Sequence, residues 1–210
     1  MTPGPAPAAS LDESVAALFP DVTSDVARRL IASAVDCFAT RGYHGTTTRD
    51  ISEGAGLSPA ALYVHFSTKE QVLFQCSLVG HQGVLTAIRA AVSEHTAPAD
   101  RLRELVRAFT LWHARYHTMC RVAQYELSAL TPEHHETVAV IRRDTERFVR
   151  EEIQRGVDSG DFVVPEVSSA ALAILSMGID VARWFQPGRA DPATLADHYA
   201  ALATAMVTGT

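Results

Sequence analysis

Apolar residues recur every three or four positions along most of the chain, and no stretch shows sustained alternation of apolar and polar residues. Spacings of three and four place side chains on one face of an α-helix, whereas alternation is typical of a strand. The pattern therefore predicts an all-α fold. The expected helices cover residues 10–19, 24–42, 47–53, 58–66, 69–94, 99–118, 120–130, 132–158, 165–186 and 192–208.

Capping residues set most of the expected helix starts. A Ser or Thr followed three residues later by an acidic residue has capping-box spacing. This spacing occurs at Ser10 with Glu13, Thr47 with Asp50, and Ser67 with Glu70. A serine before a proline is typical of an N-cap followed by the first helical position, so Ser58 and Pro59 are expected to open the helix that ends near Phe66.

Residues 24–66 are expected to form a compact unit of three helices. The second and third helices are short, and Gly56 supplies a tight turn between them. Two short helices joined by a glycine turn are the layout of a helix-turn-helix. Before this unit, residues 2–9 (TPGPAPAA) have the composition of a disordered tail.

Charge and cysteine content narrow the function classes. The net charge of −6 argues against a nucleic-acid partner in bulk, and residues 24–76 carry five basic and five acidic residues, so any DNA contact depends on local placement of charge. Lys69 is the only lysine, beside 17 arginines. Three cysteines without CxxC spacing favour a reducing, cytoplasmic setting. We expect no signal peptide, and no apolar run reaches the roughly 18–20 residues that span a bilayer.

The segment TTTRDISEGAGLSPAALYVHFSTKEQVL resembles the DNA-binding domain of TetR-type transcriptional regulators. The matching features are an apolar first helix ending F-x-x-x-G-Y, then T-T-x-x-I, A-G-L-S and L-Y-x-H-F-x-x-K-E-x-L, over about residues 26–75. The resemblance implies a helix-turn-helix DNA-binding domain over residues 24–68, after residues 1–23 with the tail and a possible short helix. It also implies an effector-binding and dimerisation domain over residues 69–210.

The family pattern implies DNA contacts at matching positions. Thr48, Arg49, Tyr63, His65 and Lys69 match positions that usually touch DNA. Arg49 is long enough to bind a guanine with two hydrogen bonds, and the side chains at 63, 65 and 69 suit phosphate oxygens. Thr47 and Thr48 are expected at a helix N-terminus, where backbone N–H groups also favour a phosphate. The complete set of expected contacts is Thr47, Thr48, Arg49, Ser58, Ala60, Ala61, Tyr63, His65 and Lys69.

Alternative roles exist for several of these residues. The alanines at 60 and 61 depart from the family pattern and offer only apolar contact, for example to a thymine methyl group. The rings of Tyr63 and His65 could simply pack against the helix. Lys69 taken alone would be an ordinary solvated residue. We expect Leu57, Leu62, Val64 and Phe66 to be mainly core or near-core.

The helix expected near 99–118 carries one stripe that changes from aliphatic to aromatic with polar tips. It runs through Leu102, Leu105, Val106, Phe109, Trp112, His113 and Tyr116. An apolar wall with a few polar groups suits a ligand pocket, and a buried core with satisfied polar ends is the alternative. His113 and His117 are four residues apart, but no third ligand stands at supporting spacing, so we expect no metal.

Later segments complete the expected effector site and a dimer interface. Arg121 and Tyr125 lie in an otherwise apolar helix, and the sequence from RVAQYELSAL onward resembles an actinobacterial branch of the family, some members of which respond to CoA thioesters. The segment VSSAALAILSMGIDVARWF is apolar nearly all round, so the core and a second subunit are expected to bury it, together with the final helix. The expected effector contacts are Phe109, Trp112, His113, Tyr116, Arg121, Tyr125, Met177, Asp180 and Trp184.

These features together predict a cytoplasmic homodimer that binds double-stranded operator DNA and is released by a small hydrophobic effector. No catalytic residue, cofactor or membrane contact is expected. The alternative is a helical enzyme or adaptor that acts on a hydrophobic small molecule without binding DNA. No nucleophile elbow, metal signature or phosphate loop supports the enzyme.

Overall fold

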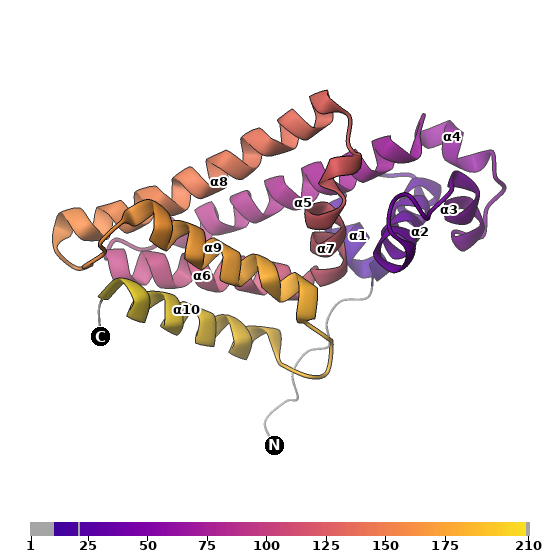
Figure 1. Ribbon diagram of the computed structural model, residues 1–210. Helices are drawn as coiled ribbons and strands as arrows, with labels where there is room; N and C mark the ends of the chain where they lie inside the picture. Colours follow the sequence, from indigo (N-terminus) through magenta and orange to yellow (C-terminus); the bar gives the residue numbers. More distant parts are fainter. Residues whose placement is uncertain (1–10, 21, 209–210) are drawn as a thin grey trace, which may run out of the picture. The chain divides into compact units, whose positions relative to one another are not determined.

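The computed structural model describes residues 11–20 and 22–208, and the described residues are helical with connecting turns and no strand (Figure 1). The expected tail over residues 2–9 and the cap at Ser10 lie outside these residues. The helices are α1 (Leu11–Leu18), α2 (Asp25–Arg41), α3 (Thr48–Gly54), α4 (Ala61–His65), α5 (Lys69–Val92), α6 (Pro98–Arg115), α7 (His117–Tyr125), the 3₁₀-helix η1 (Leu127–Ala129), α8 (Pro132–Ser159), α9 (Val167–Trp184) and α10 (Pro192–Thr208).

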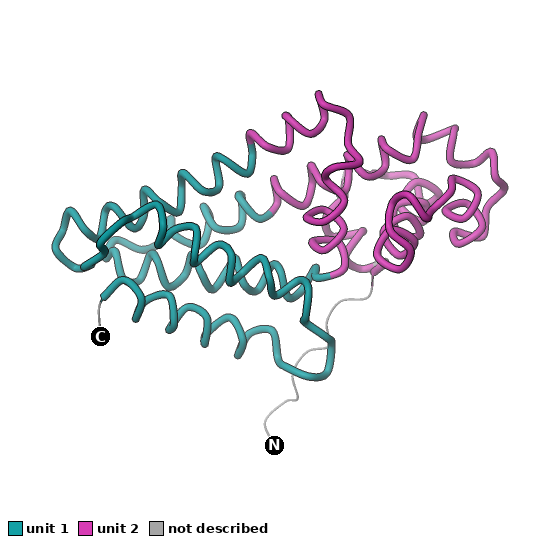
Figure 2. Tube along the Cα trace, in the orientation of Figure 1, with its two compact units in different colours: residues 1–8, 84–117, 141–210 teal, residues 9–83, 118–140 magenta. Residues whose placement is uncertain are grey.

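The chain forms two compact units (Figure 2). Among the described residues, unit 1 contains 84–117 and 141–208, and unit 2 contains 11–20, 22–83 and 118–140. Both α5 and α8 therefore contribute to each unit. The boundary between the two compact units falls inside these two helices. The boundary expected after residue 68 separates the DNA-binding part from the effector-binding part and is therefore a different kind of boundary.

Unit 2 is built on α2, which contacts α1, α3 and α4. Ser24 caps α2 by accepting a hydrogen bond from Ala27 N at 3.3 Å, and Gly42, with φ +73°, ends it. The α3 helix crosses α2 at close range, because a Cβ on Gly54 would lie 2.4 Å from Ser33 Oγ. The hydroxyl of Ser33 donates to the Ile51 carbonyl at 2.7 Å, which pins the two helices together.

The expected capping box at Thr47 is confirmed, the expected helix start at Ser58 is wrong, and α5 starts at Lys69 as expected but with different capping partners. Thr47 and Asp50 each bind the other's backbone N–H at the start of α3. The α4 helix begins at Ala61, three residues after Ser58, because Pro59 and Ala60 form a turn in which Ala61 N donates to the Ser58 carbonyl. Ser58 is therefore not its N-cap.

The start of α5 is capped one residue later than expected. Gln71 N donates to Thr68 Oγ1 at 3.0 Å, and the Gln71 side chain accepts from Ser67 N at 2.7 Å. The carboxylate of Glu70, expected to complete a box with Ser67, instead accepts hydrogen bonds from residues at the start of α8. These donors are Thr131 N at 3.0 Å and His134 Nδ1 at 2.8 Å.

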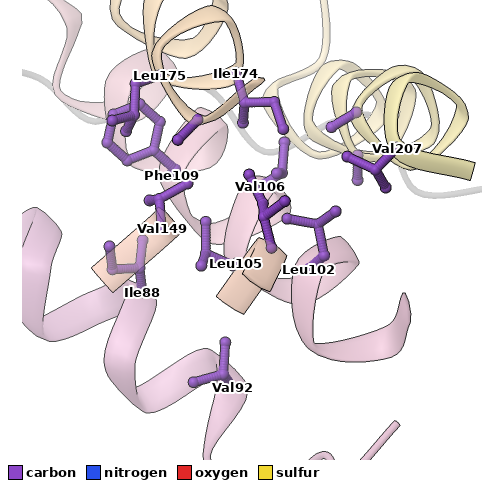
Figure 3. Close-up of a cluster of buried hydrophobic side chains, with 14 of the residues drawn as sticks. Ile88, Val92, Leu102, Leu105, Val106, Phe109, Val149, Ile174, Leu175 and Val207 are labelled. Atoms are coloured by element: carbon purple, nitrogen blue, oxygen red, sulfur yellow. The ribbon is translucent and has the colours of Figure 1, made fainter. Parts of the chain in front are cut away.

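Unit 1 has one large hydrophobic core (Figure 3). In it α6 contacts α9 and α10, and side chains from the ends of α5 and α8 also join. A Cβ on Gly156 would lie 2.0 Å from the ring of Phe162, so glycine is required for that ring to pack on α8. Side chains in the core include Ile88, Val92, Leu102, Leu105, Val106, Phe109, Val149, Ile153, Ile174, Leu175 and Val207.

A buried ion pair fastens α6 to α8 within unit 1. The guanidinium of Arg101 binds both carboxylate oxygens of Glu152, each at 2.7 Å, and the Glu152 side chain is only 2% exposed. The same guanidinium donates to the carbonyl oxygens of Val92 and His95, each at 2.8 Å. One side chain therefore joins the end of α5, the start of α6 and the C-terminal part of α8.

The α9 helix has the length and mean hydropathy of a membrane span. No apolar run of this length was expected from the sequence. Its residues nevertheless include Asp180 and Arg183, which form an ion pair at 2.6 Å. A third of the helix is buried within the chain, where Ala171, Ile174 and Leu175 join the unit 1 core. These features are those of a core helix with one exposed face.

Candidate DNA-binding interface and effector site

All nine residues expected to contact DNA lie in unit 2, on α3 and its N-cap, α4, the turn before α4 and the first turn of α5. The hydroxyl groups of Thr48 and Tyr63 are 3.1 Å apart and join α3 to α4. The Tyr63 side chain is 59% exposed, so its ring is available to a partner and does not pack beneath the helix. His65 and Arg49 are also exposed.

The N-terminus of α3 is already occupied by protein groups. Thr47 N donates to Asp50 Oδ2 at 2.7 Å, and the Thr47 hydroxyl donates to the same oxygen at 2.7 Å. These hydrogen bonds are the main reason that the pKa of Asp50 is lowered. The expected phosphate contact through Thr47 N–H would have to compete with this carboxylate, and it stays a prediction.

Lys69 is engaged with the loop between α2 and α3. Its ammonium group donates to the carbonyl oxygens of Tyr43 at 2.7 Å and Thr46 at 2.5 Å, and it lies 4.1 Å from the centre of the Tyr43 ring. Burial lowers the pKa of Lys69. Lys69 therefore has a structural role in unit 2. An ammonium has three donors, and contact between the third and a DNA phosphate stays a prediction.

The arginine expected to read a base lies on the outer face of α3. The Arg49 side chain is 74% exposed, and its Nε donates to Glu53 Oε1 at 2.7 Å. That hydrogen bond is the first cause of the raised pKa of Arg49. Arg49 and Glu53 are four residues apart, so their pairing could have been expected from the sequence. Glu53 was counted only toward the net charge of residues 24–76, and this pair was not predicted.

One expected core residue of the helix-turn-helix is wrongly assigned. Val64 is 79% exposed, whereas Leu62 and Phe66 are buried as expected. The short α4 helix has room for only one buried face, and Leu62 and Phe66 occupy it. Val64 therefore lies beside Tyr63 and His65 on the exposed part of the helix, where an apolar side chain is available to a partner.

Seven of the nine expected effector contacts lie in unit 1. The Phe109 ring is in the core and packs on Gly178, where a Cβ would lie 2.4 Å from it. His113 Nδ1 is 2.8 Å from the Phe109 carbonyl, and Trp112 and Tyr116 pack edge to face. On α9, Met177 packs against the core, Asp180 pairs with Arg183, and Trp184 is 39% exposed.

The two other expected effector contacts belong to unit 2. Arg121 Nη2 is 3.5 Å from the Ala39 carbonyl, and the Tyr125 side chain is 54% exposed. Two polar groups of α6 stand out within unit 1, because Thr110 Oγ1 and Trp112 Nε1 are buried without a hydrogen-bond partner among the described residues. The sequence stripe identified Trp112 but not Thr110.

The histidines at positions 113 and 117, four residues apart, each place Nδ1 near a backbone carbonyl oxygen. His117 Nδ1 is 3.2 Å from the Ala114 carbonyl, and its ring lies 5.4 Å from that of Phe185. Among the described residues, no group of three or more His, Cys, Asp or Glu side chains is arranged to hold a metal ion.

Comparison with known proteins places both parts of the chain in one family. Residues 30–76 match the family described as bacterial regulatory proteins, tetR family, and residues 95–207 match the tetracyclin repressor-like C-terminal domain. A bacterial regulatory protein of the tetR family from Rhodococcus RHA1 is 45% identical, with 88% of this chain and 98% of that one covered and a TM-score of 0.83.

Two further relatives extend the comparison. The HTH-type transcriptional repressor KstR2 of Mycobacterium tuberculosis is 26% identical over 76% of this chain and 80% of that protein. AibR, solved with isovaleryl coenzyme A and operator DNA, shares the fold at 24% identity and a TM-score of 0.75, with 85% of this chain and 97% of that one covered. With an all-α fold and a helix-turn-helix that presents Thr48, Arg49, Tyr63 and His65, this chain belongs to the TetR family of bacterial transcriptional regulators.

Proposed function

We propose that the chain is a cytoplasmic, homodimeric repressor that leaves its operator when a small hydrophobic effector binds. The observation that carries the DNA-binding part is the exposed group on α3 and α4, in which the hydroxyls of Thr48 and Tyr63 meet at 3.1 Å beside Arg49 and His65. Residues 24–68 act as the DNA-binding domain in this proposal, and residues 69–210 bind the effector and dimerise.

Base readout in this proposal falls mainly to Arg49. A guanidinium donates two parallel hydrogen bonds to the O6 and N7 atoms of guanine, which no alanine can do. Ala60 and Ala61 contribute apolar contact to thymine methyl groups, and Ser58 adds a hydroxyl at the start of the turn. Phosphate contacts by Thr47, Thr48, Tyr63, His65 and Lys69 set the orientation without reading sequence.

The dimer is supported by apolar side chains that unit 1 leaves exposed. Leu172 is 59% exposed on α9, and Leu202 and Met206 are 55% and 43% exposed on α10. These two helices contact each other, so a second copy that covers both forms a four-helix interface. A two-fold dimer then presents two recognition helices about 34 Å apart, one turn of DNA.

For the effector we propose an acyl-CoA or another bulky hydrophobic acid, held within unit 1 by residues of the expected set on α6 and α9. The resemblance to the actinobacterial branch supports this class, as does the shared fold of AibR, which was solved with isovaleryl coenzyme A and operator DNA. The buried Trp112 Nε1–H has no acceptor among the described residues, and a carbonyl oxygen of such a ligand would accept its hydrogen bond.

Release requires that the effector binds better to a state with low DNA affinity than to the DNA-binding state. The α5 helix is the element through which such a change would pass, because its first turn holds the helix-turn-helix loop through Lys69 and its last turns belong to unit 1. In this proposal the protein regulates and does not catalyse.

A gel-shift experiment tests the DNA-binding part. The probe is the DNA upstream of the protein's own gene, at low salt. We expect retardation by the wild type and by R103A, an exposed arginine of α6, and loss of retardation by R49A. Failure of the wild type to retard any promoter fragment would overturn the regulator and favour the adaptor or enzyme.

The effector is tested separately by native mass spectrometry of the purified protein and by thermal shifts with free fatty acids and acyl-CoAs. A raised melting temperature together with release of the DNA probe supports the acyl-CoA class. If neither acids nor CoA esters shift the melting temperature, the proposed class is wrong.

A further inference from the structure

Most cations of the helix-turn-helix are committed to partners inside unit 2. Arg29 donates to the Ala55 carbonyl, Arg41 lies 3.6 Å from Asp50, and Lys69 holds two loop carbonyls. These contacts stabilise the domain. The five basic residues of positions 24–76 are matched by five acidic ones, so the segment has no net charge. A DNA-binding unit of this kind gains little from nonspecific attraction, so its selectivity depends on how individual cations are held.

Arg49 is held in a different way, by a side chain on its own helix. The Glu53 carboxylate, 54% exposed, takes the Nε–H of Arg49 at 2.7 Å. This contact occupies the inner edge of the guanidinium. The two terminal amino groups form the outer edge, and a pair of such donors is what guanine binds through O6 and N7.

The negative charge of Glu53 also affects whether Arg49 binds a phosphate or a base. A free guanidinium on the exposed face of α3 can bind any phosphate, and such contacts carry no sequence information. A carboxylate beside it repels phosphate and restricts the rotamers of a long side chain. Guanine, a neutral base with two acceptors, is repelled less than a phosphate.

We infer that Glu53 is a specificity-determining positioning residue, which holds Arg49 for guanine and keeps it from the phosphate backbone. This inference rests on the proposed operator binding. Glu53 itself touches no base. It acts through Arg49, and its removal is therefore expected to change the ratio of specific to nonspecific affinity more than the stability of the domain, because an exposed i,i+4 pair contributes little to folding.

The test begins with an operator selected from random duplexes by the wild-type protein, and with a scrambled duplex of equal length. E53Q is the main variant and E53A the second. We expect the affinity ratio of selected to scrambled DNA to fall by roughly five- to tenfold, in the lower part of the range of one two-bonded guanine contact. The salt dependence of binding to scrambled DNA is expected to steepen by about 0.9 in logarithmic slope, because the freed arginine takes one phosphate.

Two controls separate positioning from bulk charge. D36N removes the same charge from an exposed site on α2, and it should leave the affinity ratio unchanged. In an R49A background, assayed at protein concentrations high enough to recover binding, E53Q should no longer alter the ratio. A repeat selection with E53Q should lose the preference for one guanine in each half-site, at the position that R49A also loses.

The outcomes distinguish this inference from the function on which it rests. A wild type that selects no sequence overturns both. A wild type that selects an operator, with E53Q and E53A keeping the same affinity ratio and the same selected sequence, overturns only the role of Glu53. An equal effect of E53Q with and without Arg49 also overturns it, because the charge would then act without the arginine.

Discussion

The ammonium group of Lys69 lies 2.7 Å from the carbonyl oxygen of Tyr43 and 4.1 Å from the centre of its ring. The only lysine of the chain thereby fastens the first turn of α5 to the loop that precedes α3. Hydrogen bonds from a charged donor are among the stronger ones, and this donor also satisfies the Thr46 carbonyl.

K69M, which keeps the apolar stem and removes the ammonium, should lower the free energy of unfolding by about 1–2 kcal/mol, since two carbonyl oxygens lose their donor. Urea unfolding measures the loss, with K69R as the variant that keeps the charge. If Lys69 also binds a phosphate, the logarithmic salt slope of DNA binding should fall by about 0.9 in K69M. Unfolding of K69M at the wild-type urea concentration would exclude the structural role.

G178A should destabilise the protein by about 1–3 kcal/mol, because its Cβ would meet the Phe109 ring at 2.4 Å and the packed core cannot accept it without strain. The matched control is G80A, also in a helix, where a Cβ would sit 3.7 Å from Ala123 in ordinary contact. Urea denaturation of both variants decides. Partial recovery in G178A with F109L would identify the ring as the cause, and equal stability of the two glycine variants would contradict the clash.

R101M should lower the free energy of unfolding by about 3 kcal/mol, the lower end of the range for breaking a buried pair, because the buried Glu152 carboxylate then keeps only its longer contact to Arg155 at 3.6 Å. E152Q should cost less, since the neutral amide still accepts a hydrogen bond from Arg101. A double-mutant cycle of R101M and E152M, followed by chemical denaturation, measures the coupling. Additive losses in the cycle would show that the two side chains do not stabilise each other.

Glu166 makes stability depend on pH at the start of α9. Its carboxylate accepts hydrogen bonds from Ser168 N at 2.9 Å and Ser169 N at 2.5 Å, and contacts with Ser169 and Ser168 lower its pKa from the ordinary 4.5 to about 2. A lowered folded-state pKa means that the stabilisation is fully present above pH 4.5 and is lost as pH falls toward 2.

E166A should therefore melt below the wild type near neutral pH, and the difference should shrink as pH falls from about 4.5 to about 2. Denaturation of both proteins across this range is the measurement, and E151A, an exposed glutamate of α8, is the control. A difference that does not change over this range would show that the charge of Glu166 contributes nothing.

The double variant L172E and L202E should dissociate the dimer, because each places a charge on the exposed apolar face of α9 and α10. Sedimentation equilibrium measures the mass, and V140E, the same kind of change at an exposed valine of α8, should remain dimeric. A wild type that sediments as a monomer would contradict the interface, as would a dimeric L172E/L202E.

Local capping chemistry was readable from the sequence where one side chain had one available partner. The Thr47–Asp50 pair caps α3 as expected. The start of α5 offered two adjacent hydroxyl residues and two acceptable partners, and the structure uses Thr68 with Gln71 because Glu70 is drawn to Thr131 and His134. Those two partners lie more than sixty positions along the chain, beyond the reach of a local rule.

For the candidate site residues, too, local sequence signals were readable and contacts between distant residues were not. Helical spacing identified the stripe on α6 and the matching motif identified Arg49 and Tyr63, because both signals are carried by residues close together in sequence. Whether Phe109 packs in the core, whether Val64 is exposed and which groups hold Lys69 depend on contacts between helices that no periodicity records.

By itself, the sequence determined the helical composition, the helix-turn-helix layout and the family, since hydrophobic spacing, caps and the recognition motif are local properties of the chain. The tertiary structure alone decided that the sole lysine binds loop carbonyls, that Glu70 reaches α8 and that Gly178 receives a phenylalanine ring. The physical reason is that burial and hydrogen-bond satisfaction are set by the groups that folding brings together, and these groups lie far apart along the chain.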